Sequence, residues 1–148
     1  MNKIFNTPFE TSLRILIILE SEQSIFSTDK LAAIDFISTY GSEFNLSKQN
    51  LHGENTFKFA EFSYRREMVH DAIKELVLKD LISIELTNNG FYYYINNTGI
   101  SFITKLNSSY ANQYRSTLKK CTDYIKQKNE QELLNILASH SLTSLKEV

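Results

Sequence analysis

The sequence is poor in the residues that build special sites. Its 148 residues include one cysteine, one proline, four glycines and no tryptophan. A single cysteine excludes an internal disulfide and a metal site built from cysteines, and it fits a reducing, cytoplasmic setting. Four well-separated glycines exclude a glycine-rich phosphate loop. These shortages exclude enzymes that need a disulfide, a metal site built from cysteines or a glycine-rich phosphate loop.

The chain also lacks a basic excess and a long apolar run. Lys and Arg number 16 and Asp and Glu 17, so the net charge is −1. Proteins that bind nucleic acid on their own usually carry a clear positive charge, because phosphate neutralisation supplies most of their affinity. The longest apolar stretch, Ile15 to Leu19, is too short to cross a bilayer, and no signal peptide precedes it. We therefore expect a soluble protein with no membrane partner.

Residues that could support catalysis are not grouped in any known pattern. The three histidines, His52, His70 and His140, form no paired metal-binding motif. Cys121 lies on the apolar side of a predicted helix, where a thiol is a core residue rather than a nucleophile. We expect no active site, no metal and no cofactor.

Hydrophobic residues make up 42% of the chain and follow helical periods through its first half. A capping box at Thr7 predicts a buried first helix to about Glu22, and Ser27-Thr28 opens a second that reaches about Tyr40, before Gly41. An irregular loop over 42–58, anchored by two leucines, precedes a third helix over 59–79. The leucines of that loop are Leu46 and Leu51.

The period then changes to that of strands. Ile82, Ile84 and Leu86 alternate with polar residues, and Asn88-Asn89-Gly90 predicts a tight turn before the strand 91–95. We expect Phe91, Tyr93 and Ile95 on one face of this hairpin and Tyr92 and Tyr94 on the other, with either set free.

Three shorter helical segments follow the hairpin. Thr98 is expected to cap the first, the second begins after Ser108, and an Asn129–Glu132 capping box opens the third, near 130–138. Residues 139–148 are expected to be frayed or dependent on a partner.

The order helix, helix, helix, hairpin, helix is typical of a winged helix. The fold class we predict is α+β, mainly α: a winged helix-turn-helix-like domain over 1–106 with one β-hairpin, and a C-terminal helical extension over 107–148. The extension packs either on this domain or on a partner, and the sequence leaves both open.

The third helix would be the recognition helix of a DNA-binding member. It offers Arg65, Arg66, His70 and Lys74 for contact with DNA or a partner. Its four basic and four acidic side chains cancel, however, and Lys74 is expected to pair with acidic neighbours on the helix. Arg66 is placed where it can hold a carboxylate at the edge of the core. On the hairpin, Tyr92 and Tyr94 are further contact candidates, because tyrosine suits interfaces.

Ten short stretches of the chain are familiar in their order and spacing: Asn6–Glu10, Leu13–Leu16, Ala33–Ile37, Tyr40-Gly41, Asn50–Asn55, Phe57–Phe59, Arg65–Glu67, Gly90-Phe91, Ser109–Asn112 and Tyr114-Arg115. Together they resemble the small middle components of bacterial ABC-three-component systems, the group that includes Lamassu-type antiphage defence.

This resemblance implies a role beside two other proteins. One is an ABC ATPase related to structural-maintenance-of-chromosomes (SMC) and double-strand-break repair ATPases, and the other is an effector, often a nuclease. The middle component would be a non-catalytic adaptor that holds or releases the effector. The resemblance implies no catalytic residues for this chain. It leaves open whether the loop Leu51-His52-Gly53 and the stretch Arg65–Glu67 are an interface or local architecture.

Three functions therefore compete. The adaptor reading is favoured by the balanced third helix and the missing active site, and it allows DNA contact only within the complex. A winged-helix transcription regulator is the alternative, and it requires salt-dependent binding of a short duplex. An enzyme is the least favoured, because paired catalytic residues are lacking.

Overall fold

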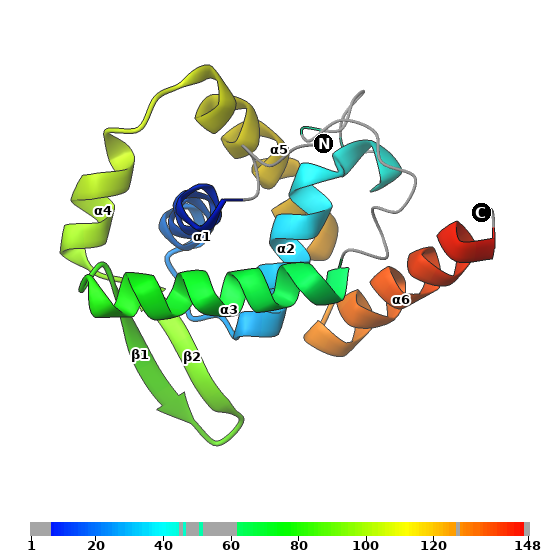
Figure 1. Cartoon of the computed structure of the whole chain (residues 1–148), viewed down its shortest axis with the longest axis horizontal. Coiled ribbons are helices and arrows are strands. Elements are labelled where there is room, and N and C mark those ends of the chain that lie inside the picture. The colour runs from blue at the N-terminus through cyan, green and yellow to red at the C-terminus, as the bar shows by residue number, and fades with distance from the viewer. Residues whose placement is uncertain (1–6, 45, 47–50, 52–61, 127, 147–148) are drawn as a thin grey trace.

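The computed structural model describes residues 7–44, 46, 51, 62–126 and 128–146, with side chains described as far as Ser139 except at residues 42 and 43. In these ranges the chain is mainly helical, with one two-stranded antiparallel sheet, as the sequence predicts (Figure 1). The elements are α1 (Pro8–Glu22), α2 (Thr28–Thr39), the 3-10 helix η2 (Gly41–Phe44), α3 (Phe62–Leu78), β1 (Ile82–Thr87), β2 (Gly90–Ile95), α4 (Asn97–Thr104), α5 (Ser109–Ile125) and α6 (Glu130–Lys146).

Side-chain caps fix where the first two helices begin. The Thr7 hydroxyl accepts a hydrogen bond from the Glu10 amide, and the Ser27 hydroxyl accepts one from the Lys30 amide. Each bond satisfies an amide that has no partner inside its helix. The predicted starts of both helices are confirmed. α2 ends at Thr39, and the chain continues at Gly41 into η2.

α1 is the central helix, as its nearly continuous apolar surface predicts. Its residues 15–19 are buried, with α3 and α4 on one side and α2 and α5 on the other. Figure 1 shows α1 end-on between these helices. α2 contributes a second buried stretch, and the loop leucines Leu46 and Leu51 are half-buried against the same core. The core is therefore built mainly by the first half of the chain.

The hairpin is anchored by its base. Ile82 pairs with Ile95 and Ile84 with Tyr93, and Asn88-Asn89 form the turn between Thr87 and Gly90. Gly90 has φ of +108°, a conformation that side chains disfavour, whereas neither asparagine adopts positive φ. The predicted faces are correct, since Tyr93 and Ile95 are buried together. Their companion Phe91, however, is exposed near the turn.

A third chain segment extends the sheet on the β2 side. Phe26, between α1 and α2, exchanges two backbone hydrogen bonds with Tyr93, at 3.0 and 2.9 Å. β2 is therefore the middle strand at this point, and β1 is the outer one. This arrangement accords with a winged helix, which stays a prediction.

α4 begins two residues earlier than expected. Asn96, not Thr98, caps it, and its side-chain oxygen accepts a hydrogen bond from the Gly99 amide at 2.9 Å. Gly99 packs so closely on the residue before β1 that a Cβ there would lie 2.2 Å from the Leu81 carbonyl oxygen. Gly99 thus allows close packing of α4 on the hairpin base.

The C-terminal segment differs from the sequence prediction in one respect. Ser108 caps α5, and the predicted Asn129–Glu132 capping box is present with both of its hydrogen bonds, at 2.9 and 2.8 Å. α6 nevertheless runs on to Lys146, well past the predicted end near 138, and dependence of its last residues on a partner stays a prediction. α5 packs its apolar side, including Cys121, against α2 and α1. The domain boundary near 107 stays a prediction.

Candidate functional site

Residues of the third helix were the main candidates for partner contact, and the structure separates them into two groups. Arg65 is buried, with 2% of its surface exposed. Arg66, His70 and Lys74 lie on the outer side of α3. The expectation that Arg65 meets a partner or DNA is therefore wrong, because its guanidinium faces the core.

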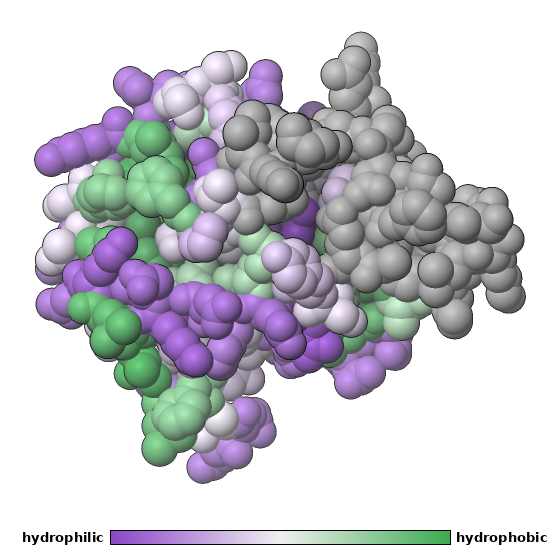
Figure 2. All heavy atoms as spheres, in the orientation of Figure 1, coloured by the Kyte–Doolittle hydropathy of each residue, from purple (hydrophilic) through white to green (hydrophobic). Residues whose placement is uncertain are grey.

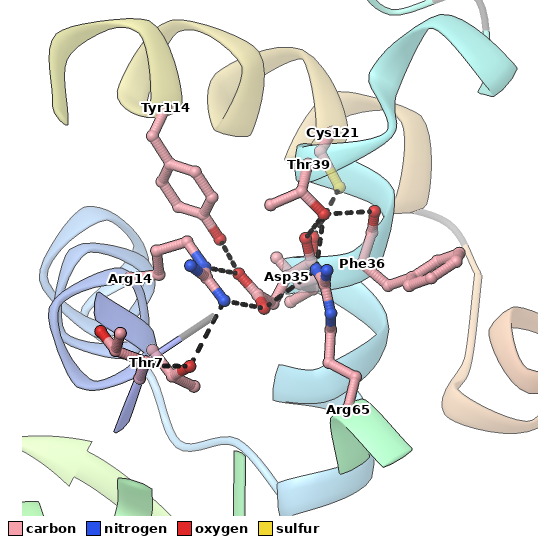
Figure 3. Close-up of polar contacts among 10 residues, drawn as sticks. Thr7, Arg14, Asp35, Phe36, Thr39, Arg65, Tyr114 and Cys121 are labelled. Carbon is pink, nitrogen blue, oxygen red and sulfur yellow. Dashed lines mark hydrogen bonds and ion pairs between the residues drawn. The ribbon is translucent and has the colours of Figure 1, made fainter. Parts of the chain in front are cut away.

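The buried polar cluster that holds Arg65 is centred on Asp35 of α2 (Figure 3). Arg14 of α1 donates to both carboxylate oxygens of Asp35, from Nε at 2.8 Å and from Nη2 at 3.3 Å. Arg65 of α3 donates to the same carboxylate at 3.5 Å, and Tyr114 of α5 donates its hydroxyl at 2.7 Å. One carboxylate thus joins four helices.

Arg65 has further contacts that fix its guanidinium. Its Nη1 donates to the Thr39 hydroxyl at 2.6 Å, and its central carbon lies 5.4 Å from the ring centroid of Phe36 and 5.5 Å from that of Tyr40. These contacts compensate part of the cost of removing the charge from water. Arg66, which the sequence places beside a carboxylate at the edge of the core, pairs with the partly exposed Asp29, and the fully buried carboxylate is held by its neighbour Arg65.

The charges of this cluster set its protonation. Burial by itself would raise the pKa of Asp35, but Arg14 and Arg65 and the hydrogen bonds lower the pKa to about 2. Burial and the nearby Asp35 carboxylate raise the pKa of Tyr114 well above its ordinary value. Asp35 therefore stays ionised and Tyr114 stays protonated at neutral pH, so neither is placed to exchange protons. The cluster is structural.

Two features of the sequence could have revealed this cluster. Arg14 stands within the apolar run of α1, and Asp35 stands between Ile34 and Phe36 in α2. A charge inside a helix that is apolar all round needs a buried partner of opposite sign.

The outer side of α3 carries mixed charge. Arg66 forms an ion pair with Asp29 of α2, from Nη2 at 2.7 Å, with both side chains partly exposed. Glu67, His70 and Asp71 lie beside this pair and, with Thr28 and Ser63, line an open hollow of about 560 Å³. With Arg65 buried, this surface has more acidic than basic groups, which is unfavourable for phosphate binding.

Lys74 stands apart from that hollow. The predicted ion pairs of Lys74 with Glu67 and Asp71 are not formed, and Lys74 has no ion pair with any residue in the described ranges. Instead, Lys79 pairs with Glu75 at 3.8 Å. Lys74 borders an apolar groove between α3 and the hairpin, lined also by Ile73, Val77, Leu78, Ile84 and Tyr93.

The remaining candidates are distributed as follows. Tyr94 is exposed and Tyr92 half-buried, on the hairpin face opposite Tyr93, so the expected grouping of the two is confirmed while their contact role stays a prediction. Leu51 is half-buried, and His52 and Gly53 lie outside the described residues.

Nothing in the described part of the chain gathers metal ligands or an active thiol. No group of three His, Cys, Asp or Glu side chains there could hold a metal ion. Cys121 is buried on α5, and burial raises the pKa of its thiol to about 12, so it is protonated at neutral pH. No helix in the described part of the chain is long and apolar enough to cross a membrane.

The buried cluster allows a direct test of its role in stability. Asp35→Asn keeps the shape of the side chain and removes the charge, which leaves Arg14 and Arg65 without their shared counter-charge. We expect the free energy of unfolding to fall by about 3–5 kcal/mol, as is usual when one partner of a buried pair is lost. Urea unfolding followed by circular dichroism measures it.

Asp29→Asn is the matched control for Asp35→Asn. It removes the same charge from another Asp–Arg pair of α2, but this pair is partly exposed. We expect it to cost under about 1 kcal/mol. Equal losses in the two variants would contradict a special role for the buried cluster.

The same cluster predicts how stability depends on pH. The pKa of Asp35 is about 2 in the folded chain and has its ordinary value of 3.8 in the unfolded one. Because the folded pKa is lower, the stabilisation is complete above pH 3.8 and is lost as the pH falls toward 2. The lost contribution is about 2 kcal/mol. Urea unfolding of wild type and Asp35→Asn at pH 5 and at pH 2.5 should therefore show their difference shrinking, and a constant difference would contradict the prediction.

Comparison with known proteins adds the identity of the family. No curated protein and no solved structure matches the chain. A family model does match, that of the ABC-three component (ABC-3C) system Middle Component 2, and it covers residues 4–147. The match spans the hairpin and the helices on both sides of it, so the resemblance suggested by the sequence is confirmed: the chain belongs to the Middle Component 2 family of ABC-three-component systems.

Proposed function

We propose that this chain is a non-catalytic adaptor that joins an SMC-like ABC ATPase to an effector, often a nuclease, in an antiphage defence complex. The observation that carries this proposal is the match to a middle-component family over residues 4–147. A component of a three-part system has two other parts to contact, so a member of this family is expected to bind proteins.

The chemistry of the described residues supports this role. The ionised groups that are buried, Arg14, Asp35 and Arg65, are held by one another and keep helices together. The one cysteine is buried and protonated, and the described histidine, His70, is exposed beside acidic groups. A surface of mixed charge and exposed apolar side chains suits protein contact better than catalysis.

The bridging role predicts a dependence among three proteins. The ATPase and the effector of the same system are to be co-expressed with and without this chain, with the tag on the ATPase. We expect the effector to remain on the ATPase only when the chain is present, because the chain supplies the contact between them. Quantitative pull-down measures the retained effector.

Two results of that experiment would count against the proposal. Equal retention of the effector without the chain would show that no bridge is needed. Failure of the chain itself to bind the ATPase and the effector would remove it from the complex.

DNA contact, where it occurs, is proposed to belong to the assembled complex. Lys74 is exposed and has no ion-pair partner among the described residues, while Arg66 is already neutralised by Asp29. On α3, one unpaired cation beside the acidic Glu67, Asp71 and Glu75 of the same helix supplies little phosphate neutralisation for binding of duplex DNA by the isolated chain. This weighs against a free-standing transcription regulator.

Binding of a short DNA duplex distinguishes the adaptor from the transcription regulator. We expect the isolated chain to show no gel shift with a short duplex even at low salt, because its electrostatic contribution is small. In the assembled complex, Lys74→Glu should lower the slope of log affinity against log salt by about 1 or more if Lys74 meets a phosphate. Lys120→Glu on α5 is the control with the same charge change. Tight, salt-dependent binding by the isolated chain would favour the regulator.

A further inference from the structure

The outer edge of β1 is open to a further strand. β2 lies between β1 and Phe26, so the sheet is closed on one side by the backbone of Phe26. On the other side, no residue in the described ranges pairs with β1. Open strand edges invite pairing with another chain, and proteins usually protect them with lysine, proline or a bulge. β1 has none of these, and its single charge is Glu85.

The register shows which backbone groups point outward. Tyr93 directs its N–H and C=O to Phe26, away from β1, so the Ile84–Tyr93 pair is one that shares no hydrogen bonds. Because the backbone groups of successive strand residues point to opposite edges, the N–H and C=O groups of Ile82, Ile84 and Leu86 point to the open edge. Asn96 confirms this alternation, since its amide donates to the Leu81 carbonyl at 3.3 Å.

The face of the sheet beside this edge is apolar and exposed. Ile84 is 47% exposed, Leu86 72% and Phe91 59%, and Leu78 at the end of α3 is 81% exposed. Figure 2 shows apolar side chains along the β1 side of the hairpin, below the hydrophilic side chains of α3. The groove between α3 and β1 leads onto this patch. Large apolar side chains gathered in one place mark an interaction surface.

We propose that a second copy of this chain covers the patch, with the two β1 strands paired antiparallel about Ile84. The hydrogen-bonded pairs are Ile84 with Ile84 of the second copy, and Ile82 with its Leu86. Polarity along residues 82–86 is apolar, polar, apolar, polar, apolar, and so reads the same in both directions. Glu85 then lies opposite Ser83 of the second copy, so no like charges are opposed. The two hairpins form one four-stranded sheet.

The ends of the hairpin favour a second copy over an unrelated strand. Antiparallel pairing brings the apolar tip of each hairpin, Leu86 and Phe91, beside the base of the other hairpin. At that base lies Leu78, the last residue of α3, which is exposed and comes four residues before the start of β1. Each copy therefore supplies both a tip and a base, as a two-fold symmetric interface requires. An isolated strand from another protein would pair with the edge but leave Leu78 uncovered.

The mass of the purified full chain tests this interface. We expect analytical ultracentrifugation to show a dimer at protein concentrations up to about 100 µM, which would populate an interface of micromolar affinity. Leu86→Lys should convert it to a monomer, because it places a charge against the apolar base of the second copy. Phe9→Lys, which changes an exposed apolar residue of α1 in the same way, should remain dimeric. Circular dichroism confirms that both variants are folded.

A disulfide cross-link tests the register. Ile84→Cys places two thiols across the two-fold axis at a Cα separation of about 5.5 Å, which a disulfide can span. Glu85→Cys is the control, because the two Glu85 positions are diagonal neighbours, about 7–8 Å apart and too far for a relaxed bridge. The native Cys121 is buried and does not compete. We expect mild oxidation to cross-link the first variant at least several-fold faster than the second.

Three outcomes overturn the proposal. A wild-type chain that is monomeric over the whole concentration range excludes the self-pairing. Equal cross-linking of the two cysteine variants excludes the register. A monomeric chain whose Leu86→Lys variant no longer binds the ATPase or the effector would assign the patch to that protein instead.

Discussion

The Asp35 carboxylate is the interaction on which the rest of the structure depends. It accepts hydrogen bonds from Arg14, Arg65 and Tyr114, which are spread over 100 residues and belong to three different helices. A buried pair of this kind adds little stability over an apolar core of equal volume, but it tolerates no missing partner. Its contribution is therefore to specify one arrangement of α1, α2, α3 and α5, because any other would leave a charge buried and unpaired.

That same cluster determines what the surface can do. A basic side chain that is buried in the core cannot contact a partner at the surface. Arg65 is one of the four cations of the third helix that could have contacted DNA, and it is buried. Asp29 neutralises a second, Arg66, and Lys79 is paired with Glu75. Lys74 is left beside an apolar groove. In the winged helix that the sequence predicts, this helix would be the one that reads DNA, and here it is occupied by internal packing and ion pairing.

Much of the fold was predictable because its determinants are local. The caps at Thr7, Ser27 and Asn129 follow from short polar motifs, and the hairpin follows from alternation around a turn rich in asparagine and glycine. The buried cluster was not predicted, since Arg65 and Arg66 are adjacent, and only the direction of the α3 axis against α2 decides which one faces Asp35. The exposure of Phe91 was not predicted either. The alternation of apolar residues gives the face of a strand on which a side chain lies, but it does not say how far α3 extends over that face.

The exposed tip of the hairpin shows how a pattern that predicts burial can instead indicate a partner. Ile84, Leu86 and Phe91 have the spacing of core residues, yet α3 covers only the base of the strands, where Ile82 and Ile95 are buried. Covering the rest would require a longer helix or a second layer, and neither is present in the described ranges. Apolar side chains at these positions lower solubility without improving the core of the single chain. Their alternation is therefore best explained by a core that is completed between molecules.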